Sequence, residues 1–248
     1  MSVCTDRNNL EYWFPILAQA NVKVPKTLIV NAPEDLNLIR YFCDEQYRPD
    51  NFSSFIDAVK AACDQVGCPS FLRTGHTSGK HYWNQTCYLT DHEPKTIAYH
   101  VQELVDYASC AGILGLPCET WVARELLKTE PAFHAFHGRL PITKERRYFI
   151  KNRAIIGHHP YWPDHAIVTP SEKDWRARLN AINRETKAEV EELTYETSKV
   201  AGYFHDAWSV DWLHTTDRGW VCIDMALAAD SFCDFEHPCA PKPHEIGQ

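Results

Sequence analysis

Two segments in the second half of the chain, residues 146–162 and 207–227, constrain the fold most strongly. Each is rich in β-branched and aromatic residues on both sides of a short polar turn, which is typical of two antiparallel strands joined as a hairpin. The turns are expected at Lys151–Arg153 and at Thr216–Gly219. The later strands come as hairpins, and the regular strand–helix alternation of a doubly wound sheet is missing. We therefore expect an α+β protein with a largely antiparallel sheet.

Helical spacing is clearest in residues 52–66, where apolar side chains recur at three- and four-residue intervals before Gly67. A second long helix is expected to begin after Pro170 and run to about residue 201, with the acidic run at 189–192 on its solvated side. The other expected elements are helices at 34–43 and about 96–112, strands at 24–31 and 120–127, a strand entering a loop within 71–83, and an irregular tail from Pro238 to Gln248.

Charge and cysteine content narrow the class of protein. The 248 residues include 33 acidic and 25 basic side chains, a net charge of -8, which argues against nucleic acid as the main partner. The ten cysteines contain no Cys-x-x-Cys pair, so they do not indicate a zinc ribbon or a redox pair. The chain opens without a signal-peptide pattern and has no long apolar stretch. We expect a soluble, cytoplasmic protein with reduced thiols and no membrane partner.

Four segments carry residues suited to a charged ligand. In the first, Arg73 and Lys80 flank small hydrogen-bonding residues that could wrap phosphate groups, although the loop is no Walker A motif and an ordinary surface loop is the alternative. The second is the pair Arg124 and Glu125, which interrupts an apolar strand. That pair could be an ion pair at a sheet edge or a hinge whose backbone amides read an adenine base.

The other two segments lie in the predicted hairpins. Alternation along the strand places Glu145 and Arg147 on one face, where Arg147 could donate to a phosphate and Glu145 could fix that ligand or a metal. Asp211 and Asp224 each stand among apolar residues, where burying a lone carboxylate is costly. Two facing carboxylates beside a phosphate suit magnesium, while two solvated strand ends are the alternative.

Taken in this order and spacing, the four segments resemble the ATP-grasp superfamily. ERRYFIKNRAIIGHHPYW (145–162) is similar to its Glu-x-Arg strand and hairpin, and VDWLHTTDRGWVCIDMAL (210–227) to its closing hairpin with two metal-binding acids. The likeness covers residues 70–160 and 203–227. It points in particular to the eukaryotic cell-division-cycle family of ATP-grasp proteins, which assist assembly of translation initiation factor two, and to related small bacterial and phage proteins.

The resemblance implies two α+β lobes that clamp a nucleotide. Residues 70–124 would form the first lobe, and 125–248 the second lobe with the metal-binding hairpin and the tail. Residues 1–69 lie outside the resemblance and are expected to form an N-terminal pre-grasp or substrate region. Ala226 departs from the pattern, because the superfamily commonly has a metal-binding Asn two residues after the last acid. The implied site residues are Arg73, Lys80 and Arg147 for catalysis, the same three with Arg124, Glu125 and Glu145 for ATP, and Asp211 and Asp224 for Mg²⁺.

The implied activity is an ATP-dependent ligase that joins a carboxylate to an amine or another nucleophile through an acyl phosphate. Its substrates would be small molecules or peptides. An alternative is an ATP-clamping assembly or binding factor that has a protein partner and little turnover. A third is an acidic interaction protein that binds no nucleotide.

Histidines offer a weaker hypothesis of a zinc site. The pairs His134/His137 and His158/His159 are close in sequence, but their spacing supplies no third and fourth ligand. The histidines better placed for substrate contact are His76 and His81 on the predicted phosphate loop.

Overall fold

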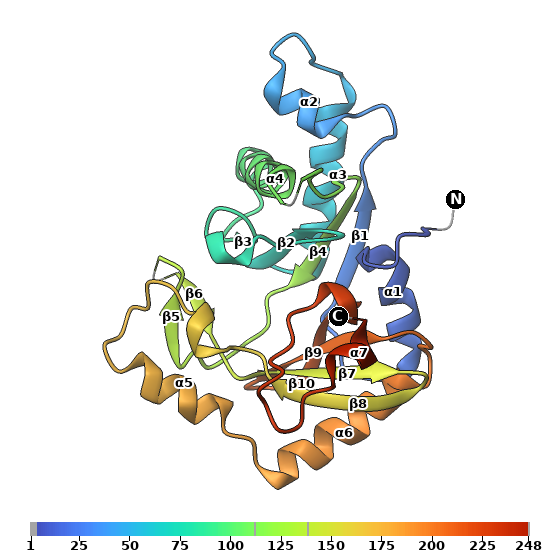
Figure 1. The fold of residues 1–248 in the computed structure, drawn as a ribbon. Helices are drawn as coiled ribbons and strands as arrows, with labels where there is room; N and C mark the ends of the chain where they lie inside the picture. The colour runs from blue at the N-terminus through green and yellow to red at the C-terminus, as the bar shows by residue number, and fades with distance from the viewer. Residues whose placement is uncertain (1–3, 112, 138, 248) are drawn as a thin grey trace. The chain divides into compact units, whose positions relative to one another are not determined.

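The computed structural model describes residues 4–111, 113–137 and 139–247 (Figure 1). The chain packs as two compact units. We call Pro25–Leu126 the inserted unit, and Met1–Val24 with Leu127–Gln248 the discontinuous unit. The three functional regions expected from the sequence stay a prediction, since these units describe packing alone.

The inserted unit is a four-stranded antiparallel sheet covered by helices. Its strand order is β1 (Thr27–Asn31), β4 (Thr120–Glu125), β2 (Ser70–Thr74) and β3 (Tyr88–Leu89). Leu72, Trp121 and Ala123 pack with α3 (Asn51–Val66) and α4 (Pro94–Ser109) in one apolar core. Because side chains alternate along a strand, Arg73 and Arg124 lie on the opposite face of the sheet. The short helix α2 (Leu38–Cys43) completes this unit.

The discontinuous unit contains a second four-stranded antiparallel sheet. Its order is β10 (Gly219–Leu227), β9 (Trp208–Thr215), β7 (Glu145–Lys151) and β8 (Ala154–Pro160). Figure 1 shows α6 (Lys187–Ala201) along one face of this sheet and the C-terminal segment, in red, along the other. The remaining elements are α1 (Leu10–Leu17), α5 (Trp175–Asn183), α7 (Pro243–Ile246) and the hairpin of β5 (Phe133–Ala135) and β6 (Leu140–Ile142).

The predicted hairpins and the α+β class are confirmed. Asn152 and Arg153 have φ angles of 50° and 64°, the left-handed conformation that a tight two-residue hairpin turn requires. The helix expected at 52–66 is α3, and Gly67 follows it with a φ angle of 101°. Among the described residues, none of the helices is long and apolar enough to cross a membrane.

The single helix expected up to residue 201 is wrong: it is two helices, α5 and α6, separated at Arg184–Thr186. The Thr186 side chain accepts a hydrogen bond from the backbone N–H of Glu189 at 3.2 Å, and so begins a new helix. Glu189 is also buried, with 7% of its surface exposed, rather than on a solvated face.

Other boundaries shift by a few residues. The helix expected at 34–43 begins only at Leu38, and the one expected at 96–112 runs from Pro94 to Ser109, with residue 112 outside the described residues. Two helices, α1 and α7 within the tail, were not expected from the sequence.

Candidate functional site

One row of polar side chains crosses the sheet of the discontinuous unit. Arg147 on β7 is paired with His159 on β8 and with Asp211 on β9, and Asp211 is paired with Asp224 on β10. Directly paired residues of antiparallel strands point to the same face. We call His159, Arg147, Asp211 and Asp224 the charged row. It lies on the face opposite α6.

Arg147 and Asp211 form a bidentate ion pair at the centre of the row. The Arg147 Nε and Nη2 atoms donate to the two Asp211 carboxylate oxygens at 2.7 and 2.8 Å. The Arg147 Nη1 atom donates to the Phe232 carbonyl at 3.0 Å, and the Tyr161 ring centroid lies 4.6 Å from the guanidinium carbon. Burial alone would lower the pKa of Arg147, but the Asp211 carboxylate outweighs it and raises that pKa.

A β-bulge gives Asp224 its place in the row. Along the β9–β10 pair, Cys222 is opposite Trp212, and the register then shifts so that Asp224 rather than Ile223 is opposite Asp211. A bulge adds one residue to one strand and re-aims the side chains that follow it. Two carboxylates that interrupt apolar strands are therefore brought together on one face.

The two carboxylates of the row match the chemistry of a magnesium site in part. Carboxylate oxygens are the donors that Mg²⁺ prefers, and it usually keeps waters and phosphate oxygens as its other ligands. Ala226, which is paired with Ser209, has no donor atom to add. No group of three or more His, Cys, Asp or Glu side chains in the described part of the chain could hold an ion, which leaves a zinc site without support too. A cation on Asp211 would compete with Arg147 for the carboxylate.

Glu145 lies on the same face of β7 as Arg147 but has a structural contact of its own. Its Oε1 atom accepts a hydrogen bond from the Trp162 indole N–H at 2.9 Å and one from the Thr143 hydroxyl at 3.3 Å. Glu145 is 6% exposed. The carboxylate therefore fixes the chain that follows β8, and a ligand-binding role for it stays a prediction.

In the inserted unit, two arginines lie on the sheet face away from the helices. Arg73 is paired with Val122, and Phe71 with Arg124, so the two arginines are diagonal neighbours on β2 and β4. Each is 5% exposed, and the Arg73 Nε atom donates to the Thr74 carbonyl at 3.0 Å. Two buried cations on one face of a sheet are suited to a polyanion.

Glu125 ends β4, one residue before the inserted unit ends. Its carboxylate accepts the Lys26 N–H at 2.6 Å, and its own N–H donates to the Lys26 carbonyl at 3.0 Å. Arg124 and Glu125 thus lie at the end of the chain segment that forms the inserted unit. Both interpretations of the Arg124–Glu125 pair, a hinge and an ion pair, stay predictions.

The loop after β2 uses its amides internally. The N–H groups of His76 and Thr77 donate to the Thr74 hydroxyl oxygen at 3.2 and 3.0 Å, and the Gly79 N–H donates to the Thr77 hydroxyl at 3.3 Å. Gly79 has a φ angle of 57°, which favours glycine. These three amides bond within the loop, and the phosphate-binding role of the loop and of Lys80 stays a prediction.

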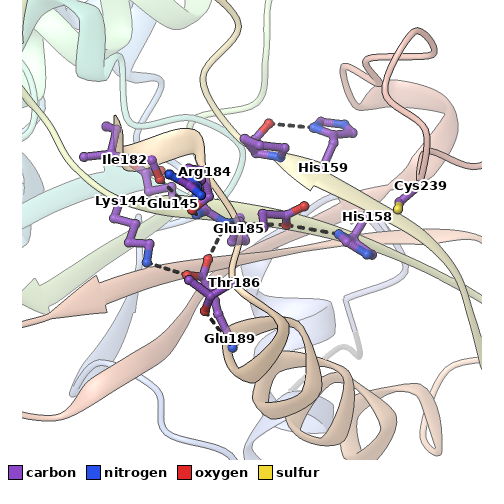
Figure 2. A network of polar contacts seen from close by, with 12 residues as sticks. Lys144, Glu145, His158, His159, Ile182, Arg184, Glu185, Thr186, Glu189 and Cys239 are labelled. Carbon is purple, nitrogen blue, oxygen red and sulfur yellow. Dashed lines mark hydrogen bonds and ion pairs between the residues drawn. The ribbon is translucent and has the colours of Figure 1, made fainter. Parts of the chain in front are cut away.

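A buried network that was not predicted from the sequence lies on the other face of the second sheet (Figure 2). The Arg146 side chain is fully buried, and its Nε atom lies 2.6 Å from Glu189 and 3.5 Å from Glu185. Lys144 is also ion-paired with Glu189, and His158 lies 3.1 Å from Glu185. This network holds the α5–α6 connection against the sheet. The one signal for it was the Thr-x-x-Glu pattern of a capping box at 186–189.

Comparisons with known proteins identify the fold. The structure of Cdc123 from Schizosaccharomyces pombe matches with a TM-score of 0.54 and 12% identity, over 91% of this chain and 87% of that chain. The biotin carboxylase domain of a Hydrogenobacter thermophilus 2-oxoglutarate carboxylase, solved with MgADP, matches with a TM-score of 0.50 and 9% identity, over 88% and 39%. A RimK domain ATP-grasp protein from Sphaerobacter thermophilus matches with a TM-score of 0.47 and 12% identity, over 88% and 58%.

The chain therefore spans less than two thirds of the length of the last two proteins. The sequence matches no protein-family model, and no curated protein sequence is significantly similar to it. At identities this low, likeness between structures shows the fold alone. This chain has an α+β ATP-grasp fold, and it resembles ATP-grasp proteins that include Cdc123.

Proposed function

We propose that this protein is an ATP-dependent ligase that joins a carboxylate to an amine or another nucleophile. The observation that carries the proposal is the charged row, which places an arginine beside two carboxylates on one strand face of an ATP-grasp fold. Arginine binds phosphate oxygens, and paired carboxylates bind a divalent cation. The charged row therefore offers a cation for the phosphate oxygens of ATP and two carboxylates for the metal ion bound to them.

The other site residues have roles that follow from their charge and place. Arg73 and Lys80 would bind phosphate oxygens, in addition to Arg147. Arg124 and Glu125, at the connection between the units, would contact the nucleotide base through their backbone. Glu145 would act through Trp162, whose position it fixes.

The chemistry requires no nucleophile from the protein. A carboxylate oxygen of the substrate attacks the γ-phosphorus of ATP, ADP leaves, and the amine then displaces phosphate from the acyl phosphate. Arg147, Arg73 and Lys80 would offset the negative charge on the transferring phosphoryl group, and they would position it for attack. A magnesium ion held by Asp211 and Asp224 would neutralise further phosphate charge when bound.

Calorimetric titration with ATP and magnesium tests the nucleotide part of the proposal. Asp224→Asn should remove most of the binding, because it takes one carboxylate from the row, and it should leave the fold intact. Asp217→Asn is the matched control, since Asp217 is an exposed acid in the turn of the same hairpin. Unaltered affinity in Asp224→Asn would show that the metal assignment is wrong.

A second candidate function is an ATP-clamping assembly factor with little turnover, which binds a protein partner. Ala226, which supplies no third ligand, favours it, as does the similarity in fold to Cdc123. Release of ADP and phosphate, measured with pools of carboxylates and amines, separates the two functions. Steady release supports the ligase. Binding of ATP and of a protein partner without release supports the assembly factor.

A further inference from the structure

We infer, on the basis of the proposed function, that the Arg147–Asp211 ion pair is a latch. In its closed state the two side chains bind each other. It opens when a polyphosphate takes Arg147 and a divalent cation takes Asp211 at the same time. Each ligand should therefore bind weakly alone and strongly in the presence of the other.

In the closed latch, the Arg147 guanidinium and the Asp211 carboxylate bind each other, and these are the two charged groups that the ligands would need. Both Asp211 oxygens accept from Arg147, at 2.7 and 2.8 Å. The third guanidinium nitrogen donates to the Phe232 carbonyl at 3.0 Å, and the guanidinium carbon lies over the Tyr161 ring. The two side chains are 11% and 6% exposed. A phosphate on Arg147 or a cation on Asp211 would therefore compete with an ion pair that is already made.

Coupling follows from the cost of leaving one buried charge without its partner. A phosphate that took Arg147 alone would leave Asp211 buried and unpaired, which is strongly unfavourable. A cation that took Asp211 alone would leave Arg147 unpaired and close to a second positive charge. With both ligands bound, Arg147 exchanges the Asp211 carboxylate for a phosphate, and Asp211 exchanges the Arg147 guanidinium for the cation. By linkage, each ligand must raise the affinity for the other by the same factor.

The neighbours of the pair fit this role. Asp224 is half-buried and directly opposite Asp211, so a cation that reaches it lies beside the latch. The charge of Asp224 also acts on Arg147. On the other side, the His159 Nδ1 atom lies 2.7 Å from the Pro160 carbonyl, and its Nε2 atom accepts the Asp234 N–H at 3.2 Å. Histidine with one N–H and one accepting nitrogen is neutral, so His159 adds no competing cation.

The first test measures ATP affinity by calorimetry, with EDTA or with magnesium. In the wild-type protein, magnesium should tighten ATP binding by a factor within the usual range of about 5 to 150. Asp211→Asn keeps the shape but removes the charge that holds Arg147, so its metal-free affinity for ATP should rise about tenfold, and the magnesium effect should shrink. Asp174→Asn, which breaks the exposed pair with Arg178 on α5, is the control and should change neither value. A metal-free affinity in Asp211→Asn equal to or weaker than that of wild type overturns the latch.

The second test needs no nucleotide. Arg147→Met leaves Asp211 without its partner beside Asp224, so Mn²⁺ alone, followed by electron paramagnetic resonance, should bind about tenfold more tightly than to wild type. Arg147→Lys keeps a cation next to Asp211 and should stay close to wild type. If Arg147→Met loses its near-ultraviolet circular dichroism, Arg147→Gln replaces it. Unchanged Mn²⁺ affinity in the variant that folds overturns the latch.

The two tests also separate the latch from the proposed function. If wild-type protein binds ATP but Asp211→Asn shows no gain, the latch is wrong and the proposed function stands. If ATP does not bind with or without magnesium, the proposed function is wrong. The Mn²⁺ measurement then supports or overturns the latch by itself.

Discussion

Arg146 and Arg147 are neighbours in sequence, but they point to opposite faces of β7 and have different partners. Arg147 belongs to the charged row, where it forms an ion pair with the candidate metal ligand Asp211. Arg146 is buried against Glu185 and Glu189, and burial lowers its pKa. Of these two arginines on one strand, Arg147 is therefore a candidate ligand-binding residue and Arg146 a structural one.

His159 makes the stability of this protein depend on pH. Burial lowers its pKa from 6.5 to about 4, so the folded state holds it neutral while the unfolded chain binds a proton below about pH 6.5. Stability should therefore fall as the pH drops from 6.5 toward 4, with a total contribution of about 3 kcal/mol from this residue. Urea denaturation at several pH values across this window measures the effect.

Two variants isolate the contribution of His159. His159→Asn should lower stability overall but remove this part of the pH slope, because the unfolded chain no longer gains a proton at that position. His214→Asn, at an exposed position of β9, should keep the slope. Equal slopes in wild type and His159→Asn would contradict a neutral, buried His159.

At the scale of elements, the packing of the C-terminal segment against the second sheet was not predicted from the sequence. It contacts the face that carries the charged row through Phe232 and Asp234, and the Cys239 carbonyl accepts the His158 N–H at 2.8 Å. Gly157 makes this close approach feasible. A Cβ atom at Gly157 would lie 2.5 Å from the Pro241 nitrogen and 2.7 Å from the Cys239 oxygen.

Gly157→Ala should therefore push the segment away from β8. We expect a loss of about 1–3 kcal/mol in the free energy of unfolding, as for other overpacked sites. Faster proteolytic cleavage after residue 228 should accompany it, because local opening exposes the chain. Gly202→Ala is the control, since a Cβ atom there would have its nearest contact at 3.5 Å. Equal cleavage rates in the two variants would mean that the segment is not held by this contact.

The sequence predicts elements well where a local pattern decides them, and poorly where a distant residue does. Alternation and turn residues suffice for the two hairpins, and helical spacing for α3. The break before α6 was visible only as a Thr-x-x-Glu pattern, and the burial of Glu189 depends on Arg146, which is 43 residues away in the sequence. The bulge that aligns Asp224 with Asp211 has no glycine or proline to mark it.

At the scale of the whole molecule, the fold class followed from the hairpins, and the fold itself from the resemblance of the four segments to ATP-grasp proteins. The division into units could not be predicted, because the N-terminal residues pack with the far end of the chain. The Lys23 carbonyl accepts the Cys222 N–H at 2.8 Å, and the Asn8 side chain accepts the Leu227 N–H at 2.8 Å. No local pattern in residues 1–24 indicates these partners.

Only part of the candidate site could be predicted, again because some of its contacts join residues that are far apart in the sequence. Charged residues in apolar strands marked Arg147, Asp211 and Asp224, and the structure brings these three together. The ion pair between Arg147 and Asp211 could not be predicted. It depends on strand register and on the C-terminal segment, which accepts the third hydrogen bond of Arg147. Roles in ligand binding stay predictions for all of the site residues.

A crystal structure with magnesium and a non-hydrolysable ATP analogue tests the central claim most directly. We predict a triphosphate in contact with the Arg147 guanidinium, a cation on Asp211 and Asp224, and no remaining Arg147–Asp211 hydrogen bonds. A nucleotide bound elsewhere, with Arg147 and Asp211 still paired, would contradict the proposed site.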